Sequence, residues 1–312
     1  MLAPLVLRNL MNQVLITGIT NGSIYGIVAM SYAIVFYVTR VVNFATGQVM
    51  MAAIMVTTAL SMKNLPISLS IIIGISTSII LSLIIYFIGV RPVQRLDRFS
   101  FAWLVSTMGI GIVIESIAAV IWGVGSEPFP QLLNGKTFAF LGGRLTAQQA
   151  MCFLVAIFIV AAYEVLRRKT LFGKLGMAIS SDPEIASTIG GNVKGYAIFA
   201  FAISGLLVGV AGVLVGPTSF ADAYLGGTFG ISGFVALMIG GIESPVGAMF
   251  GGFTLGILES FAVTYINAQS ASWFPFVIVL LVLLLAPDGI FTSGKAIKKN
   301  FRKILSNTKV AA

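Results

Sequence analysis

The sequence of 312 residues contains no histidine, a single cysteine and few charged residues. Histidine is the commonest metal ligand and the commonest general base in proteins, so its absence argues against a metal centre or a hydrolase triad of the usual kind. Cys152 has no second cysteine with which to form an internal disulfide, and it is interpreted as a small buried hydrophobic residue. We therefore expect a chain that is not an enzyme and that holds neither a metal nor a cofactor of its own.

The scarcity of charge is matched by high hydrophobicity. Charged residues make up 9% of the chain, against roughly 25% in a typical soluble domain, while 58% are hydrophobic and the mean hydropathy is +1.02. A soluble core has no room to bury that much apolar surface, so the composition indicates one membrane domain over residues 1–312. The net charge of +9 comes from short clusters rather than from a basic face with interleaved aromatic residues, which argues against nucleic-acid binding.

Long apolar stretches dominate the chain, and each is close to the roughly 20 residues that a helix needs to cross a bilayer. Because lipid cannot satisfy backbone polar groups, stretches of this length indicate helices rather than barrel strands. The predicted fold is an all-α polytopic transmembrane helix bundle of about eight or nine spans, in which residues 229–242 form one short or re-entrant glycine-rich segment. The other stretches lie at 14–38, 41–62, 67–90, 100–122, 148–166, 196–216, 246–266 and 272–290.

Three basic clusters predict the orientation of the bundle. Arg91–Arg98, Arg167–Lys174 and Lys295–Lys303 are expected in the cytoplasm because cytoplasmic loops carry an excess of Lys and Arg. Residues 123–147 and 217–228 are then expected outside. The number of spans stays open: if 229–242 crosses the membrane there are nine and the N-terminus is outside, whereas a re-entrant segment gives eight and an N-terminus inside.

Glycines recur at intervals of three or four residues within the apolar stretches. Small residues at these spacings let helix backbones approach closely, so the pattern predicts tight helix packing. The alternative interpretation is that some of these faces slide during a transport cycle. The glycines are Gly18, Gly22 and Gly26; Gly205, Gly209, Gly212 and Gly216; and Gly247, Gly251, Gly252 and Gly256.

The loop 167–195 is the longest polar stretch predicted on the cytoplasmic side, and it contains signals for a short helix over 183–189. Ser181 or Asp182 is placed to cap this helix, with Pro183 in its first turn and Glu184 near the positive end of its dipole. The pair at 190–191 supplies glycine to end it. The helix is either a surface linker or a docking element for a cytoplasmic partner.

The segment GKLGMAISSDPEIASTIGGNVK resembles the cytoplasmic EAA-type loop of bacterial ABC importer permeases, and it is most similar to the branched-chain amino acid permeases of the LivH/LivM family. Asp182, Ala186 and Gly190 fall where that family has its acidic, alanine and glycine positions. The resemblance implies that Asp182, Pro183, Glu184, Ala186 and Gly190 belong to a coupling helix that enters a groove on an ATPase subunit.

Further segments resemble the same family along most of the chain. They are the N-F-A-x-G signature at 43–47, the glycine-rich LMIGGIESPVGAMFGGFTLGILES before the last span, and LAPDGIF with Pro287, Gly289 and Ile290. The chain departs from the family pattern at Thr46, where histidine is common, and at Met177, where arginine is common. A third departure is Glu243, which replaces a glycine of the turn.

Candidate pathway residues lie where polar groups interrupt apolar spans. Asn43, Thr46 and Gly47 start an otherwise apolar stretch, and discontinuous helices expose backbone groups that bind the carboxylate and ammonium of a zwitterion. The alternative is polar packing between helices at the cytoplasmic interface. Asn21 and Tyr25 lie one helical turn apart. Two carboxylates lie within spans, where a charge usually faces protein or water. Glu115 is favoured over Glu259 as a pathway residue, because Glu259 is close enough to a helix end to reach the interface.

The resemblance implies a function and a set of partners. It implies the transmembrane permease subunit of an ABC importer in the bacterial inner membrane, moving branched-chain or related neutral amino acids by alternating access. The implied partners are two ATPase subunits that bind ATP and magnesium, a second permease subunit and an extracytoplasmic solute-binding protein. The alternatives are a permease for urea, short amides or another small neutral solute, and a self-sufficient channel or secondary carrier.

Overall fold

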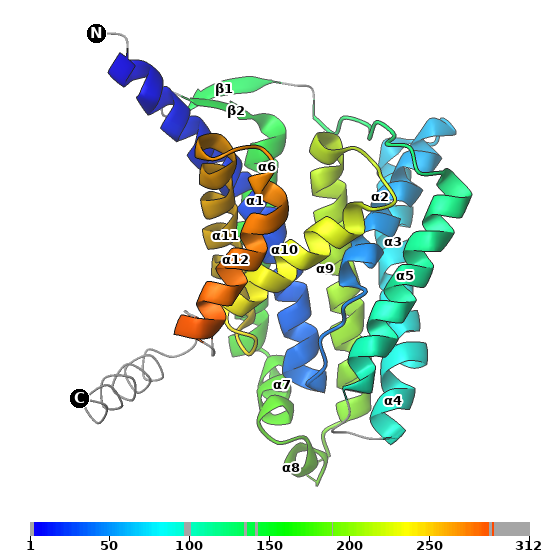
Figure 1. The fold of residues 1–312 in the computed structure, drawn as a ribbon. Coiled ribbons are helices and arrows are strands. Elements are labelled where there is room, and N and C mark those ends of the chain that lie inside the picture. Colours follow the sequence, from blue (N-terminus) through cyan, green and yellow to red (C-terminus); the bar gives the residue numbers. More distant parts are fainter. Residues whose placement is uncertain are drawn as a thin grey trace, which may run out of the picture.

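The computed structural model describes residues 3–96, 101–133, 136–140, 143–188, 190–286 and 289. Over these residues the chain is a bundle of helices with one small hairpin (Figure 1). The helices are α1 Ala3–Thr39, α2 Thr46–Met62, α3 Ile67–Ile85, α4 Arg91–Leu96, α5 Ala102–Trp122, α6 Ala147–Lys169, α7 Leu171–Ser181, α8 Pro183–Thr188, α9 Val193–Ser219, α10 Leu225–Gly240, α11 Pro245–Tyr265 and α12 Ser270–Leu285. A π-helical turn, η1 Tyr86–Val90, joins α3 to α4.

Most of these helices are suited to a bilayer. Six stretches of the described residues are long and apolar enough to cross a membrane, and they correspond to α1, α3 with its continuation, α5, α6, α9 and α11. The apolar helices α2, α10 and α12 are shorter, at 17, 16 and 16 residues. The predicted all-α polytopic bundle is confirmed at this level, and a two-stranded hairpin is added to it.

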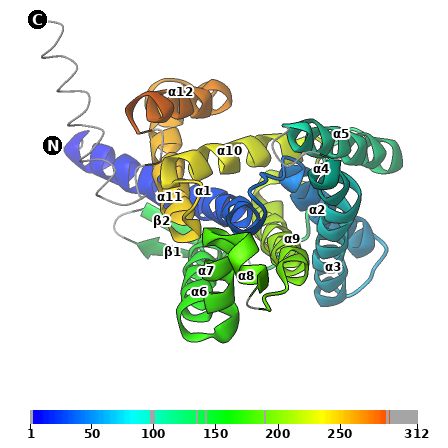
Figure 2. The ribbon, with the colours of Figure 1, turned by 90° about the horizontal axis from the view of Figure 1, so that it is seen from below.

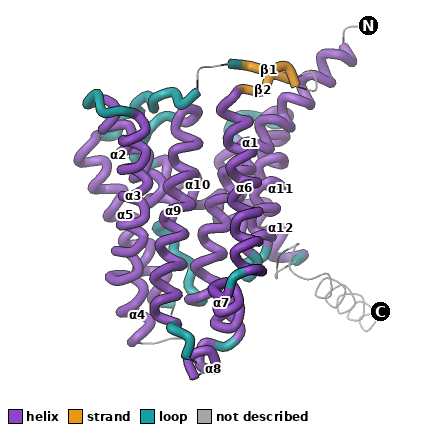
Figure 3. Tube along the Cα trace, turned by 180° about the vertical axis from the view of Figure 1, so that it is seen from behind, coloured by secondary structure: helices purple, strands orange, loops and turns teal. Residues whose placement is uncertain are grey.

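The two ends of the bundle differ in structure (Figure 3). One end carries the hairpin of β1 Thr137–Phe140 and β2 Gly143–Thr146, together with an antiparallel bridge between Glu127 and Ala221. The other end carries α4, α7 and α8. The loops predicted outside thus share one end, and the described parts of the basic clusters at 91–98 and 167–174 share the other. Arg98, Pro287, Ile290 and the cluster 295–303 lie outside the described residues.

Helix α1 is the centre of the bundle, surrounded by α6, α9, α10 and α11 (Figure 2). Its closest partner is α11, where glycine faces glycine: a Cβ placed on Gly252 would lie 2.2 Å from the Gly26 nitrogen, and one on Gly256 would lie 2.3 Å from the Gly22 nitrogen. Side chains cannot fit between backbones at this distance. The predicted glycine faces on these two helices are therefore packing faces.

Helices α3 and α9 pack through a second glycine face, supported by serine hydroxyls. Ser78 Oγ donates to the Gly205 carbonyl at 2.8 Å, and Ser82 Oγ donates to the Phe201 carbonyl at 2.7 Å. Hydroxyl-to-carbonyl bonds of this kind join helices within a bilayer, where water is not available as a partner.

Residues 221–244 run from one end of the bundle to the other. Ala221 pairs with Glu127 at the hairpin end, and Glu243 forms an ion pair with Arg40. Arg40 also donates to the carbonyl of Ser180 in α7, which places Glu243 at the α7–α8 end. Helix α10, which lies obliquely between these two points (Figure 1), spans about 24 Å at 1.5 Å per residue.

Candidate coupling segment and membrane pathway

The segment between α6 and α9 contains more helix than the sequence predicted. It begins with α7, a helix of 11 residues that was not predicted, whose first turn is capped by the Thr170 hydroxyl accepting from the Gly173 amide at 3.0 Å. The corner is tight, because a Cβ on Gly173 would lie 2.3 Å from the Arg167 carbonyl oxygen. The Thr-x-x-Gly spacing was available in the sequence, but the glycines at 173 and 176 weaken a helix prediction.

The short helix α8 forms where the sequence predicted it. Asp182 Oδ1 accepts from the backbone amides of Glu184 at 2.9 Å and Ile185 at 3.0 Å, which is the geometry of an N-cap. At the other end Gly190 has a φ of +88°, and the Gly191 amide donates to the Ala186 carbonyl at 2.9 Å. The helix therefore has both predicted caps and ends at Thr188, while Ile189 lies outside the described residues.

The exposed surface of α8 includes one large apolar side chain. Ile185 is 61% exposed, whereas the neighbouring Ala186 is 1% exposed. The helix lies at the extreme end of the molecule, beyond the ends of the membrane-length helices (Figure 3). Its exposure at this end of the molecule leaves the Ile185 side chain available for contact with a partner. The sequence analysis did not single out Ile185, because its exposure depends on the direction in which the whole helix faces.

Arg40 connects α7 to the turn between α10 and α11. It follows α1 with a left-handed φ of 57°, and its guanidinium forms an ion pair with Glu243. The second guanidinium nitrogen donates to the carbonyl of Ser180, in the last turn of α7, at 2.7 Å. Glu243 stands where the family pattern has glycine, and in this structure its carboxylate pairs with Arg40.

The polar residues before α2 form local structure within the bundle. Asn43 and Thr46 are each 1% exposed. Asn43 Oδ1 accepts from the Ala45 amide at 3.2 Å, and Thr46 Oγ1 donates to the Asn43 carbonyl at 2.6 Å. Gly47 is a contact point between helices, because a Cβ there would lie 2.0 Å from the Gly226 carbonyl oxygen of α10. These contacts account for the three residues by packing, and their role in a pathway stays a prediction.

Glu115, the favoured carboxylate, is half-buried on α5. Its Oε2 accepts from Gln48 Nε2 of α2 at 3.3 Å, so the pair joins the carboxyl half of α5 to the first turn of α2. Large apolar side chains around Glu115 are exposed, including Ile112 at 65% and Ile117 at 52%. A carboxylate is costly against lipid, which indicates that protein or water covers this part of the α5 face in the assembled protein.

Tyr25 meets the other carboxylate, Glu259, rather than Glu115. Its hydroxyl donates to Glu259 Oε1 at 3.2 Å, and its ring lies 5.8 Å from that of Phe229. Glu259 is only 8% exposed, and its Oε2 has no hydrogen-bond partner among the described residues. Asn21, one turn before Tyr25, is half-buried. The two intramembrane carboxylates therefore belong to separate polar pairs, and Gln48 and Glu259 were missing from the predicted set.

Comparison with known proteins gives a match over most of the chain. The family described as branched-chain amino acid transport system, permease component, matches residues 14–286. The high-affinity branched-chain amino acid transport system permease protein LivH of Salmonella typhimurium is 29% identical over 292 residues, covering 89% of this chain and 94% of the relative. LivH of Escherichia coli K12 gives the same identity and coverage.

A relative with a different transport name also matches. The galactose/methyl galactoside import permease protein MglC of Salmonella typhimurium is 27% identical over 276 residues, covering 80% of this chain and 79% of that protein. Among solved structures, a chain of PsaBC from Streptococcus pneumoniae in complex with Fab is similar at a TM-score of 0.47 and 16% identity, covering 92% of this chain and 97% of that one.

Proposed function

Since this chain belongs to the family of permease components of branched-chain amino acid transport systems, we propose that it translocates branched-chain or related neutral amino acids. Membership of this family makes the chain a multi-pass membrane subunit of an ABC importer rather than an enzyme. The match to LivH covers 89% of this chain and 94% of LivH, whereas the match to MglC covers 80% of this chain and 79% of MglC. The more extensive match supports amino acids over the sugar substrate named for MglC. The few charges within the spans suit a solute with no net charge.

The observation that carries the coupling role is the doubly capped helix α8 at the basic end of the bundle. Its polar caps fix a six-residue helix that is too short to be stable by itself. The exposed Ile185 then provides the apolar contact that an ATPase groove requires. Asp182, Pro183, Glu184, Ala186 and Gly190 act in this proposal by holding α8 in place, and Ile185 makes the contact.

Arg40 is the proposed route from the coupling segment into the bundle. A movement of α7 acts on the guanidinium through the Ser180 carbonyl, and the guanidinium acts on the α10–α11 turn through Glu243. Both carboxyl and guanidinium groups are about half exposed, so the pair by itself contributes only about 0–1 kcal/mol to stability. The importance of the contact in this proposal lies in its position between moving elements.

Replacing Arg40 by alanine is expected to lower uptake about five- to tenfold, because two charge-assisted contacts worth about 1–1.4 kcal/mol together are lost. ATP hydrolysis by the assembled transporter is expected to stay near the wild-type rate. Uptake in proteoliposomes and ATPase activity measured on the same preparation check this. The double variant Arg40→Glu with Glu243→Arg restores part of the uptake, and Arg91→Ala serves as the control for loss of a cytoplasmic arginine. Equal losses of uptake and hydrolysis would contradict the proposed route.

We propose nine membrane passes with an external N-terminus. The supporting observation is that residues 221–244 connect the hairpin end to the α7–α8 end, so α10 is treated as a short span. Residues 40–45 connect the end of α1 to the start of α2 without helix, and residues 40–62 are counted as one pass in this proposal. Under this proposal the start of α1 lies on the hairpin side, as Figure 1 has it.

The pathway is proposed along the face of α5 and α2 that carries Glu115 and Gln48, where a second permease subunit covers it. The half-buried carboxylate supports this position, since lipid is an unfavourable environment for it. Asn21 and Tyr25, with Glu259, are proposed to form a second polar patch along α1. Asn43, Thr46 and Gly47 support the pathway by fixing the start of α2. The full assembly is proposed to contain two permeases, two ATPases that hold ATP and magnesium, and one solute-binding protein.

The test of the proposed function is uptake of labelled leucine by cells with and without the gene, with isoleucine, urea, acetamide and galactose as separate competitors in excess. Gene-dependent uptake that isoleucine alone blocks is the expected result. Uptake that persists when the partner ATPase is inactivated would overturn the proposal of ATP-driven import and would favour a channel or carrier. Absence of gene-dependent leucine uptake would overturn the substrate assignment.

A further inference from the structure

One buried carboxyl oxygen of the bundle has no hydrogen-bond partner that the described residues supply. Among these residues, two buried side-chain atoms lack such a partner, Gln148 Oε1 and Glu259 Oε2. The Gln148 amide carries no charge at any pH, whereas Glu259 can ionise. Glu259 is 8% exposed and lies about 9 Å along α11 from the last residue of that helix. A group that can hold a negative charge is therefore enclosed within a membrane-length helix.

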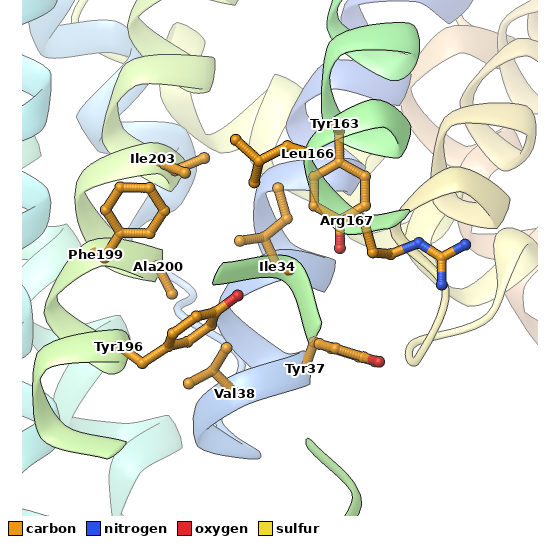
Figure 4. A pocket seen from close by; sticks show the side chains of 11 residues that line it. Ile34, Tyr37, Val38, Tyr163, Leu166, Arg167, Tyr196, Phe199, Ala200 and Ile203 are labelled. Atoms are coloured by element: carbon orange, nitrogen blue, oxygen red, sulfur yellow. The ribbon is translucent and has the colours of Figure 1, made fainter. Parts of the chain in front are cut away.

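The other acidic side chains of the long apolar helices have a positive partner or partial exposure. Arg167, which lines a pocket of about 30 Å³ between α6 and α9 (Figure 4), donates to both oxygens of Glu164, at 2.9 and 2.8 Å. Glu115 on α5 is half-buried and accepts from Gln48. Glu259 has no positive partner in the described part of the chain, and it is more buried than Glu115.

Neutral hydroxyl groups form the polar surroundings of Glu259. The Tyr25 hydroxyl of α1 donates to Glu259 Oε1 at 3.2 Å, and it has the side chain of Ser232 in α10 as a second hydrogen-bond partner. Tyr25 and Ser232 are both buried. The three side chains therefore form a series of hydrogen bonds across α10, α1 and α11 that ends at the carboxyl group.

Three of the helices that pack on α11 bring no charge to Glu259. Helix α11 packs on α1, α10 and α12, and over a short contact on α6. Helices α10 and α12 contain no charged or titratable residue, and α11 itself contains only Glu259 and Tyr265. On α6, Cys152 faces α9, where its thiol donates to the Leu214 carbonyl, and the charged residues begin only at Glu164, at the cytoplasmic end.

Helix α1 likewise supplies no charge near Glu259. Its single charged residue is Arg8, about 25 Å along the helix from Tyr25. Tyr32 and Tyr37 lie about two turns or more beyond Tyr25, toward the cytoplasmic end. An ionised Glu259 would therefore be a buried anion with one neutral donor and no counter-charge among the described residues, which is a costly arrangement within a membrane-length helix.

We propose that Glu259 is a proton-binding site, whose carboxyl group is protonated and neutral while α1, α10 and α11 are packed around it. The proton, taken from water, forms the O–H bond at Oε2, and Oε1 stays the acceptor for the Tyr25 hydroxyl. An unpaired O–H group costs less than an unpaired charge, and a proton needs no space beyond the carboxyl group itself. A metal ion fits less well, because the described residues hold no group of three or more acidic, histidine or cysteine side chains.

The proton links the charge of Glu259 to the packing of α1 on α11. Glu259 lies on the helix whose glycines, among them Gly256, meet the backbone of α1. Separation of the two helices admits water to the carboxyl group and lets it release the proton. The folded bundle thus binds one more proton at neutral pH than the unfolded chain, so its stability falls as the pH rises.

Infrared difference spectroscopy of the purified, assembled transporter near neutral pH tests for the proton directly. Subtracting the spectrum of Glu259→Gln from that of the wild type is expected to leave one carbonyl band of a neutral carboxyl group. Glu164→Gln is the matched control and is expected to leave carboxylate bands instead, because two guanidinium groups hold Glu164 ionised. Carboxylate bands in the Glu259→Gln difference would overturn the proposal.

A second variant, Tyr25→Phe, keeps the proposal falsifiable if Glu259→Gln does not assemble. It retains the carboxyl group and removes the hydroxyl that donates to Oε1, so the band of the neutral carbonyl is expected to shift. An unshifted spectrum, or the appearance of carboxylate bands, would contradict a protonated Glu259 in contact with Tyr25.

The pH dependence of stability gives an independent measurement. Size-exclusion chromatography records the yield of monodisperse transporter after incubation over a pH series. From about pH 6 to about pH 9, the yield of the wild type is expected to fall about tenfold more than that of Glu259→Gln, which has no proton to lose. Equal falls in the two proteins would overturn the proposal. Neither measurement involves transport, so the proposal stands or fails independently of the proposed function.

Discussion

Replacing Ile185 by glutamate is expected to reduce uptake at least about thirtyfold while the protein still reaches the membrane in normal amounts. Ile185 is 61% exposed on the outer surface of α8, so the substitution removes no packing within the chain. In an ATPase groove the same residue is desolvated, and a charge placed there loses about 2 kcal/mol or more of interface energy. Uptake in proteoliposomes and the amount of ATPase copurified with the permease are the two measurements.

The control for Ile185→Glu is Ser187→Glu, which adds the same charge to the same helix two residues later. Ser187 is exposed, and its hydroxyl donates within its own helix to the Glu184 carbonyl at 2.7 Å. It is expected to keep most of the activity, because it points away from Ile185 on a helix of this pitch. Normal uptake by Ile185→Glu would remove α8 from the interface. Equal losses in both variants would show that charge on the helix matters rather than the apolar contact.

Much of the fold was predictable from the sequence because lipid leaves few choices for the backbone. A stretch of about 20 apolar residues has to be a helix, and basic clusters orient it. The short helix α8 was predictable for a local reason: Asp182 and the glycines at 190–191 act on neighbouring amides and carbonyls, so no tertiary contact is needed. The glycine spacing of α1 and α11 likewise predicted close packing, and the two sets face each other.

The parts that were not predictable depend on contacts between distant residues. Arg40 and Glu243 are 203 positions apart, and no periodicity or spacing relates them. Tyr25 and Glu259 are 234 positions apart, and the choice of Glu115 over Glu259 followed helix ends rather than packing. Helix α7 was missed because its glycines lower helix propensity, whereas in the structure Tyr196 packs directly on Gly176. In each case the sequence supplied the residue types, and the helix arrangement supplied the pairing.

Replacing Gly256 by valine is expected to lower the yield of folded permease strongly. A Cβ at this position would lie 2.3 Å from the nitrogen and 2.4 Å from the Cα of Gly22, and both atoms belong to the backbone of the central helix α1. Since no side chain can move aside, α1 and α11 have to separate, and α1 also carries the contacts to α6, α9 and α10. Overpacking usually costs about 1–3 kcal/mol, and contact with two backbones places this site at the upper end of that range.

Detergent extraction followed by size-exclusion chromatography measures the consequence for Gly256→Val, and the yield of monodisperse permease is expected to fall at least about tenfold, the equivalent of about 1.4 kcal/mol. Gly109→Val on α5 is the matched control, because a Cβ at Gly109 meets no atom within 4 Å. The same substitution in the same kind of helix thus differs only in what the new side chain touches. If the two variants are recovered equally, α1 and α11 do not pack through their glycine faces. If only Gly256→Val is lost, close backbone contact explains why glycine recurs on both helices.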